Sequence, residues 1–267
     1  MPSRVTVSEK NRLRIGRLAT ITLDFVAECP HDQQHYFPCG FVRRVRGPFG
    51  GLRFLRGEIM RTIAYVDGFN LYYGSLKNTP HKWLDLCEYF RSTLPPGCTL
   101  EKVKYFTARV KPLPHDPDAP KRQDVFLRAM QAHSGRHIQI LEGHFSVKNV
   151  RMAQTAPPHR TVEVIKTEEK GSDVNLAVEL VNDAWLDAFD CAAVMSNDAD
   201  LQRSLKIVKQ HRRKKVFLYT PGAPTRKPLG TLTRWSHKQI DVLSADLAAC
   251  QMPLALDGGK IVKPASW

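Results

Sequence analysis

From Met60 onward, short apolar segments alternate with longer segments of helical periodicity. Residues 63–66 and 191–195 are short and almost wholly apolar, a pattern typical of parallel strands that are covered on both faces. Strands that alternate with helices indicate a parallel sheet with right-handed crossovers. The sequence therefore predicts an α/β fold in which a central, mostly parallel sheet is flanked by helices.

The periodicity also predicts the individual elements. We expect strands at 63–66, 103–110, 137–141, 191–195 and 216–219, and helices at 83–94, 123–133, 172–185 and around Leu201, Leu205 and Val208. The helix at 172–185 has the clearest apolar face, formed by Val174, Ala177, Val178, Val181 and Trp185. Residues 144–161 show no clear period, so we expect a long loop or an irregular hairpin there.

The chain before Met60 has a different character. Residues 1–59 show no sustained period and include a stretch rich in Gly, Pro and Arg at 43–51. Two interpretations stay open: an irregular basic extension that grips phosphates, or translated upstream sequence with Met60 as the true start. We expect a folded domain at 60–245 and a C-terminal tail at 246–267 that is loosely held after Pro253.

The chain is strongly basic, with 40 Lys and Arg against 26 Asp and Glu and a formal net charge of +14. Such a charge favours an anionic partner, most economically a nucleic acid. No apolar run approaches the roughly 18 residues of a membrane-spanning helix, and the N-terminus does not resemble a secretory signal. Six scattered cysteines fit a reducing compartment. We therefore expect a cytoplasmic protein with no membrane association, and the oligomeric state stays open.

Aspartates stand where such a sheet places functional groups. Asp67 directly follows the first predicted strand, Asp198 and Asp200 follow the strand at 191–195, and Asp173 lies in the first turn of a helix behind Ser172 as the expected N-cap. Taken singly, each aspartate is explained as a turn former or a helix cap. Because functional groups of open α/β sheets gather beyond the carboxyl ends of the strands, we expect Asp67 and Asp198 to face one crevice.

The chemistry of such a cluster points to a divalent cation. Carboxylates that converge on one crevice repel one another unless some are protonated or a cation neutralises them. Hard oxygen ligands without His or Cys favour Mg²⁺ or Mn²⁺ over zinc. A divalent cation held by carboxylates in a very basic protein indicates phosphate chemistry.

Three sequence blocks carry these aspartates: YVDGFNL at 65–71, KGSDVNL at 170–176 and SNDADL at 196–201. In order and spacing they resemble the signature blocks of NYN-domain proteins, which belong to the PIN-like nuclease superfamily, and the resemblance spans about residues 60–243. It implies a PIN-like three-layer α/β fold and a metal-dependent ribonuclease site. The residues that it implies for this site are Asp67, Asp173, Asp198 and Asp200, with Asn70 orienting the substrate or a ligand water.

Within that resemblance we assign roles to the aspartates. Asp67, Asp173 and Asp198 are expected to bind one or two Mg²⁺ or Mn²⁺ ions, and Asp200 either binds through water or accepts the proton of the nucleophile. The third block departs from the more usual Ser-Gly-Asp-x-Asp-Phe at Asn197 and Leu201 but keeps both aspartates.

One further acidic residue is excluded from the site. Glu179 lies six residues after Asp173, about 240° around an ideal helix. The two residues therefore do not share one metal ion, and we expect Glu179 to be a solvated helix residue.

Basic and aromatic residues near these blocks are candidates for binding RNA. Lys206, Lys209, Arg212 and Arg213 are expected to follow the phosphate backbone, with a solvated polar face as the alternative. Lys170, just before the second aspartate block, is another candidate for contacting a substrate phosphate. Tyr72 and Tyr73 either stack a base or pack into the core.

The sequence thus predicts a metal-dependent (endo)ribonuclease that hydrolyses RNA, and two alternatives stay open. The first is a non-catalytic RNA-binding NYN module, against which the four aspartates argue because a pure binder gains nothing from acidic groups that face phosphates. The second is another Asp-x-Asp enzyme, such as a phosphatase or a nucleotide-sugar transferase. A haloacid-dehalogenase-type phosphatase carries its Asp-x-Asp on the first strand, whereas here that motif comes late, at Asp198 and Asp200.

Overall fold

The computed structural model describes residues 11–14, 20–23, 42–46, 52–56, 59–222 and 225–267. The chain forms two compact units, Met1–Ile59 and Met60–Trp267. In the first unit, β1 (Asn11–Arg14) pairs with β2 (Thr20–Leu23), and β3 (Val42–Arg46) pairs with β4 (Leu52–Arg56), both antiparallel. The segment expected to be irregular therefore contains regular strands, while its remaining residues, most of the predicted basic extension, lie outside the described part of the chain.

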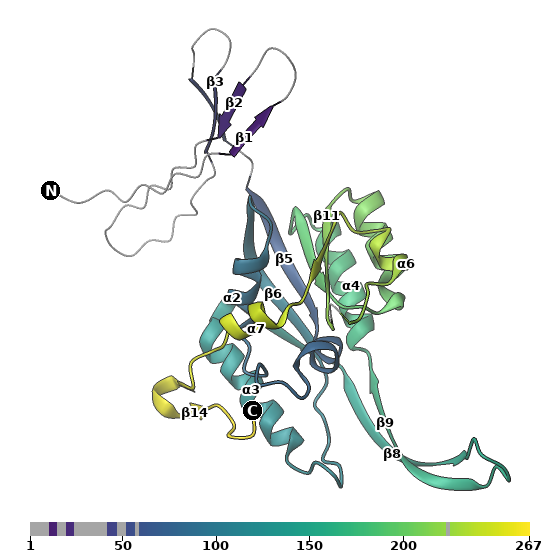
Figure 1. Ribbon diagram of the computed structural model, residues 1–267. Coiled ribbons are helices and arrows are strands. Elements are labelled where there is room, and N and C mark those ends of the chain that lie inside the picture. The colour runs from purple at the N-terminus through teal and green to yellow at the C-terminus, as the bar shows by residue number, and fades with distance from the viewer. Residues whose placement is uncertain (1–10, 15–19, 24–41, 47–51, 57–58, 223–224) are drawn as a thin grey trace. The chain divides into compact units, whose positions relative to one another are not determined.

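The second unit is built on a six-stranded sheet with the order β12-β11-β10-β5-β6-β7 (Figure 1). Every neighbouring pair of these strands is parallel. The strands are β5 (Met60–Asp67), β6 (Cys98–Thr107), β7 (Ile138–Glu142), β10 (Cys191–Met195), β11 (Lys215–Thr220) and β12 (Lys238–Asp241). The prediction of an α/β fold with a mostly parallel central sheet is confirmed.

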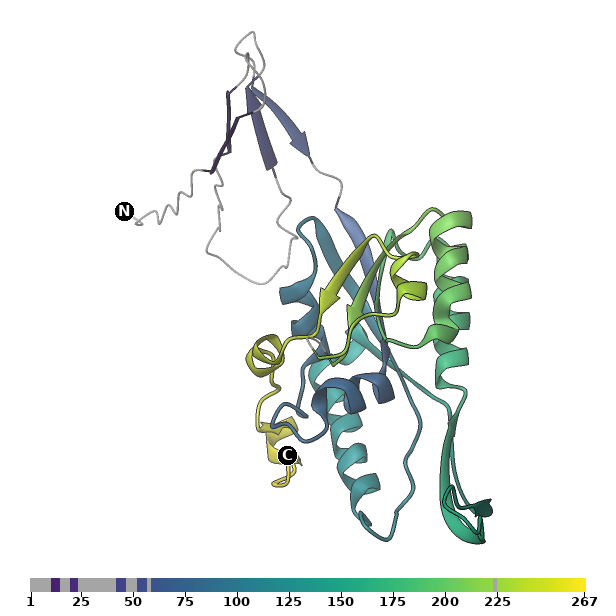
Figure 2. The ribbon, with the colours of Figure 1, turned by 45° about the vertical axis from the view of Figure 1, so that its right-hand side comes forward.

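Helices cover both faces of the sheet and make three layers (Figures 1 and 2). One face carries α1 (Gly68–Leu71), α2 (Leu86–Thr93), α3 (Ala119–Ser134) and α7 (Ser244–Ala249), with the short turns η1 (Tyr72–Leu76) and η2 (Gly135–His137). The other face carries α4 (Ser172–Trp185), α5 (Gln202–Lys206) and α6 (Gly230–Thr233), with η3 (Ala199–Leu201) and η4 (Ile207–His211). Between each of the two helical layers and the sheet lies a separate hydrophobic core.

The alternation of side chains along β5 decides on which face the first aspartate lies. Ala64 and Val66 pack in the core with α2 and α3, whereas Ile63 and Tyr65 pack in the core with α4. Successive side chains of a strand point to opposite faces, so Asp67 continues the series of Ile63 and Tyr65. It therefore emerges on the side of the sheet that α4 covers.

The segment between β7 and α4 is a long regular hairpin. β8 (His144–Ala153) and β9 (Thr161–Lys170) pair antiparallel along their whole length, and Figure 1 shows the hairpin leaving the body of the unit as an arm. Of the two expectations for 144–161, the long loop is wrong, and the hairpin is present but is regular and extends to Lys170. Residues 161–170 form the second strand of this hairpin. Because both strands are mostly exposed, their sequence lacks the alternation of apolar and polar residues that would predict them.

The bounds of α4 are as predicted, but its buried face is not. Leu176, Leu180 and Ala184 are fully buried against the sheet. In the predicted apolar stripe, Val174, Val178 and Trp185 are exposed, whereas Ala177 and Val181 are partly buried against the same core. We call Val174, Val178, Val181 and Trp185 the outer face of α4. Both sets of residues recur with helical spacing, so the sequence pattern could not distinguish the face that meets the sheet.

The C-terminal tail is packed against the domain, and the expectation of a loosely held tail is wrong. After Pro253, β13 (Ala255–Leu256) pairs with β14 (Ile261–Val262) around the turn η5 (Asp257–Gly259). The ring of Trp267 lies 6.3 Å from that of Trp83 and 5.7 Å from that of Phe126, edge to face. In the described part of the chain, no helix combines the length and hydropathy needed to span a bilayer.

Candidate metal centre

The first and third sequence blocks meet at the carboxyl edge of the sheet. β5 and β10 are neighbours, and Val66 pairs with Met195, so the residues that follow these two strands emerge side by side. Asp67 is the N-cap of α1 and accepts a hydrogen bond from the backbone N–H of Asn70 at 2.9 Å. A Cβ atom on Gly68 would lie 2.6 Å from the ring of Tyr105, so only glycine permits this close turn behind Asp67.

Hydrogen bonds lock the two blocks together. The hydroxyl of Ser196 donates to Oδ2 of Asp67 at 3.0 Å, and the oxygen of that hydroxyl accepts the backbone N–H of Asp198 at 3.2 Å. Oδ1 of Asn70 accepts the backbone N–H of Asn197 at 3.3 Å. Asn70, predicted to contact the substrate, therefore positions the loop that carries Asp198.

The second block brings Asp173 to the same edge in the first turn of α4. The N-cap of this helix is Gly171, whose φ of 94° is a conformation that glycine adopts without strain. The backbone N–H of Ser172 donates to Oε1 of Glu169 at 2.9 Å, so the cap is supplied by a side chain of the preceding strand. The expectation that Ser172 is the N-cap is wrong by one residue.

Three carboxylates converge to form the centre, and we call Asp173, Asp198 and Asp200 the aspartate trio. One oxygen from each of them lies within 4.8 Å of the others. Asp198 is half-buried and accepts the backbone N–H of Asp200 at 3.0 Å, while Asp200 is exposed. No Lys or Arg of the described residues forms an ion pair with the trio. Three unpaired hard oxygen donors fit a divalent cation such as Mg²⁺ or Mn²⁺.

Asp67 lies beside the trio rather than within it, and its environment differs. Burial raises the pKa of its carboxyl above the ordinary value, and repulsion from Asp198 acts in the same direction. The hydrogen bonds from Asn70 and Ser196 act against this shift. A cation at the trio would offset the cost of keeping Asp67 ionised.

The structure does not bring all the predicted basic residues to this centre. Nζ of Lys209 donates to the carbonyl oxygens of Arg234 and Ser236. The guanidinium of Arg212 donates to the carbonyl oxygens of Ala184 and Trp185 at the end of α4. Because Asp173 is in the first turn of the same helix, Arg212 lies about 18 Å from it along the helix axis.

The other predicted basic residues lie at the surface in different surroundings. The ammonium of Lys206 stands 5.4 Å from the ring centroid of Trp235. Arg213 follows the last turn of η4 with a φ of 53°. Lys170 ends β9, next to the second block, and its Nζ is 3.4 Å from Oε2 of Glu168. Of the basic candidates, Lys170 is therefore the one that the chain holds beside Asp173.

A loop that the sequence did not single out is tied to the centre through Asn197. The Nδ2 of this buried side chain donates to the carbonyl oxygen of Lys227 at 3.1 Å, and its Oδ1 accepts the backbone N–H of Leu229 at 3.0 Å. The loop therefore presents the exposed side chains of Arg226 and Lys227 next to the third block. The sequence feature that could have indicated this loop is Asn197, which stands where the family pattern more often has glycine.

Glu179 is not a solvated residue, contrary to expectation. Its Oε2 accepts a hydrogen bond at 2.6 Å from Nζ of Lys104, which also lies 2.6 Å from Oδ2 of Asp183. The hydroxyl of Tyr65 donates to the same Asp183. Although burial acts to lower the pKa of Lys104, its hydrogen bonds to Asp183 and Glu179 raise it above the ordinary value. This network fastens α4 to β6 beneath the centre.

The two tyrosines have different environments. Tyr72 packs against the core, whereas Tyr73 is exposed. Tyr73 stacks on Phe69 at 6.5 Å between ring centroids, and Phe69 stacks on Phe145 of the hairpin at 6.2 Å. A short ladder of aromatic rings therefore starts two residues after Asp67.

Comparisons with known proteins show the family of this chain. A family model of the NYN domain matches residues 61–231, which include all three sequence blocks. The 6-hydroxy-3-succinoylpyridine 3-monooxygenase HspA of Pseudomonas putida is 31% identical over 243 residues, 80% of this chain and 78% of that protein. A solved structure of a protein of unknown function from Vibrio parahaemolyticus has a TM-score of 0.44 and 14% identity, and the match covers 70% of this chain and 95% of that one. The chain therefore belongs to the NYN domain family.

Proposed function

We propose that this protein is a metal-dependent ribonuclease that hydrolyses RNA phosphodiester bonds in the cytoplasm. The observation that carries the proposal is the aspartate trio, three carboxylates without a cationic partner among the described residues, at the carboxyl edge of a parallel sheet. The NYN family match supports it, since this family is related to the PIN-like nucleases. The formal charge of +14 supports an RNA substrate.

In this proposal each acidic residue has its own role. Asp173 and Asp198 hold Mg²⁺ or Mn²⁺, and the buried Asp67 contributes a third carboxylate from beside them. When bound, the cation supplies charge neutralisation at the scissile phosphate and lowers the pKa of water. Asp200, the exposed member of the trio, accepts the proton of the attacking water.

RNA would reach the centre along basic groups on its two sides. Lys170 stands at the start of α4, and Arg226 and Lys227 stand on the loop that Asn197 holds. Neither Arg226 nor Lys227 forms an ion pair within the described residues, so both are available for phosphates. Arg212, at the far end of α4, is too distant to contact the scissile phosphate.

The test uses the full chain with labelled single-stranded and structured RNA in Mn²⁺, Mg²⁺ or EDTA. We expect cleavage in Mn²⁺ or Mg²⁺, none in EDTA, and a loss of at least about 100-fold in Asp198→Asn. Asp241→Asn, at the same sheet edge but on the outer strand β12, is the matched control and should cleave normally. In parallel, Mn²⁺ should raise the Tm of the wild type but not that of Asp198→Asn, because a ligand stabilises only a state that binds it.

Three results would contradict the proposal in different ways. If the protein binds RNA without cutting it under any metal condition, the non-catalytic RNA-binding module replaces it. If it hydrolyses small phosphoesters or transfers a sugar from a nucleotide but leaves RNA intact, a different Asp-x-Asp enzyme replaces it. A metal-independent Tm together with RNA cleavage in EDTA would refute the metal site itself.

A second candidate function follows from the relative in Pseudomonas putida. That protein is named a monooxygenase of 6-hydroxy-3-succinoylpyridine, and the similarity covers 80% of this chain. A monooxygenase places one oxygen atom of O₂ in its substrate and reduces the other to water with two electrons from a reductant. The test supplies this pyridine, O₂ and a reduced nicotinamide or flavin, and measures oxygen uptake and the hydroxylated product. Substrate-dependent uptake with no RNA cleavage would select this candidate over the ribonuclease.

A further inference from the structure

The outer face of α4 is an apolar surface without a cover among the described residues. Val174, Val178 and Trp185 are 61%, 60% and 60% exposed, and Leu186 directly after the helix is 69% exposed. They follow one side of the helix from its first turn to its last. Contiguous apolar surface of this kind marks an interaction site, whereas single exposed apolar residues do not.

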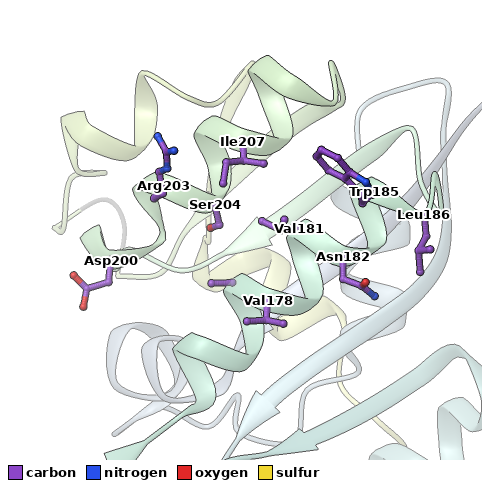
Figure 3. Close-up of a pocket in the computed structure, with 10 residues that line it drawn as sticks. Val178, Val181, Asn182, Trp185, Leu186, Asp200, Arg203, Ser204 and Ile207 are labelled. Carbon is purple, nitrogen blue, oxygen red and sulfur yellow. The ribbon is translucent and has the colours of Figure 1, made fainter.

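This face forms one wall of a groove, and α5 with η4 forms the other. Figure 3 shows Val178, Val181, Asn182 and Trp185 of α4 opposite Arg203, Ser204 and Ile207. Asp200 of the aspartate trio lies at one end of the groove, and Trp185 and Leu186 lie at the other. The groove therefore runs from Asp200 along α4 from Ala177 to the C-terminal end of the helix.

The two ends of the groove carry opposite charge. The aspartate trio lies at the N-terminal end of α4, where Arg203 is the basic residue of the opposite wall. At the C-terminal end, the guanidinium of Arg212 stacks 4.8 Å from the ring centroid of Trp185, and Arg213 is the next residue along the chain. Asp187, which is also at this end, is already paired with Lys214. A complementary occupant of the groove is an apolar helix with one basic and one acidic end. It lies antiparallel to α4, so that its basic end meets the aspartate trio and its acidic end meets Arg212.

α4 of a second copy of this chain has these properties. We propose that the protein forms a two-fold symmetric dimer in which the outer faces of two α4 helices pack antiparallel. An axis midway between Val178 and Val181 places each of these residues opposite the other, and it places Val174 opposite Trp185. A small side chain then meets a large one at each end of the contact. A parallel arrangement would instead bring the two trios together, and like charges in contact are unfavourable.

The dimer has a consequence for the metal centre. Arg212 is fixed to Trp185 by stacking and by its hydrogen bond to the Trp185 carbonyl oxygen. Since Trp185 of one copy faces Val174 of the other, Arg212 of the second copy comes beside Asp173 of the first. A basic residue that is about 18 Å from the centre within one copy is thus placed at the centre of the other copy, where it can bind a substrate phosphate.

The test is the oligomeric state of the full chain in sedimentation, which does not depend on any activity. We expect the wild type to be a dimer, and Val178→Asp and Val181→Lys each to be a monomer with an unchanged circular dichroism spectrum. Mixed in equal amounts, the two variants should form a heterodimer. The carboxylate introduced in one copy then meets the ammonium introduced in the other, while the second contact keeps both valines. Val262→Asp, a similarly exposed valine outside the groove, is the control and should remain dimeric.

Three results would overturn the proposal. A wild type that is monomeric at all concentrations would refute the dimer. A dimer that persists in both variants would place the interface elsewhere. Monomeric variants that do not associate when mixed would refute the antiparallel register. If the variants lose their fold, Trp185→Ala replaces them and should weaken dimerisation without a charge in the contact.

Discussion

At Asp67, burial disfavours the charged carboxylate that binding of a cation would favour. Its carboxyl is buried, so the protein without metal keeps a costly charge there, and its folded pKa is raised above the ordinary value of 3.8. A carboxyl with a raised folded pKa binds more protons in the folded state. The free energy of unfolding therefore falls as the pH rises from about 4 through the folded pKa.

We expect Asp67→Asn to remove this component of the pH dependence. Asparagine keeps an oxygen that can accept the backbone N–H of Asn70, and it places an amide N–H₂ where Oδ2 accepts the hydroxyl of Ser196, so that it donates to the Ser196 oxygen instead. In the absence of metal, the variant should be more stable at neutral pH by on the order of 1 kcal/mol, and the proposed nuclease activity should be lost. Urea unfolding in EDTA across a pH series measures this difference. A variant that is less stable than the wild type at neutral pH would show that the charge of Asp67 is well solvated.

Asn197 holds the loop that carries Arg226 and Lys227 next to the metal centre. Asn197→Ala removes the partners of the Lys227 carbonyl and the Leu229 N–H, at a cost of about 1–3 kcal/mol. We expect weaker binding of RNA to Asn197→Ala, and a salt dependence reduced by about one unit of slope in Lys227→Ala. Filter binding at several salt concentrations measures both effects, with Asn149→Ala on the hairpin as the matched control. Unchanged affinity in both variants would exclude the loop from the RNA path.

At the scale of elements, the position of α4 depends on a buried charge network. Lys104→Met would leave Glu179 and Asp183 without their cation, and breaking a buried ion pair in this way costs about 3–5 kcal/mol. Lys121→Met, which breaks the exposed pair with Asp118, should cost less than about 1 kcal/mol. Thermal unfolding measures both.

Restoring neutrality should restore part of the stability of α4. We expect Glu179→Gln with Asp183→Asn to recover much of the loss in the Lys104→Met background, because no unpaired charge then stays buried. If Lys104→Met is as stable as the wild type, the network does not hold α4 on the sheet. The wild-type position of Asp173 would then rest on apolar contacts such as those of Leu176, Leu180 and Ala184.

At the scale of the whole molecule, the C-terminal tail closes the face of the sheet that carries α2 and α3. Trp267→Ala removes the ring that packs on Trp83 and Phe126, and we expect a loss of about 1–3 kcal/mol in the free energy of unfolding. Leu254→Ala, at a side chain that is 71% exposed, should change it by less than about 0.5 kcal/mol. Equal effects of the two substitutions in urea unfolding would mean that the tail is not part of the core.

The sequence by itself determined the order of most strands and helices, the bounds of α4 and β10, and the edge at which the aspartates gather. Local periodicity sets an element, and parallel strands present their carboxyl ends together, so Asp67 and Asp198 could be placed on one edge without any coordinates. The family of the chain was also readable from three short blocks, because the residues that shape this edge are close together in sequence within each block.

Only the tertiary structure decided which partners these residues take. α4 carries apolar residues on two sides, and Leu176 and Leu180 are buried against the sheet, while Val174, Val178 and Trp185 of the outer face are exposed. Lys104 donates a hydrogen bond to Glu179, which is 75 residues away in the chain, and Asn197 donates one to the carbonyl oxygen of Lys227, 30 residues away. Such pairs leave no periodic signal in the sequence. Their physical cause is that a buried polar group must find a partner, and the fold decides which one is within reach.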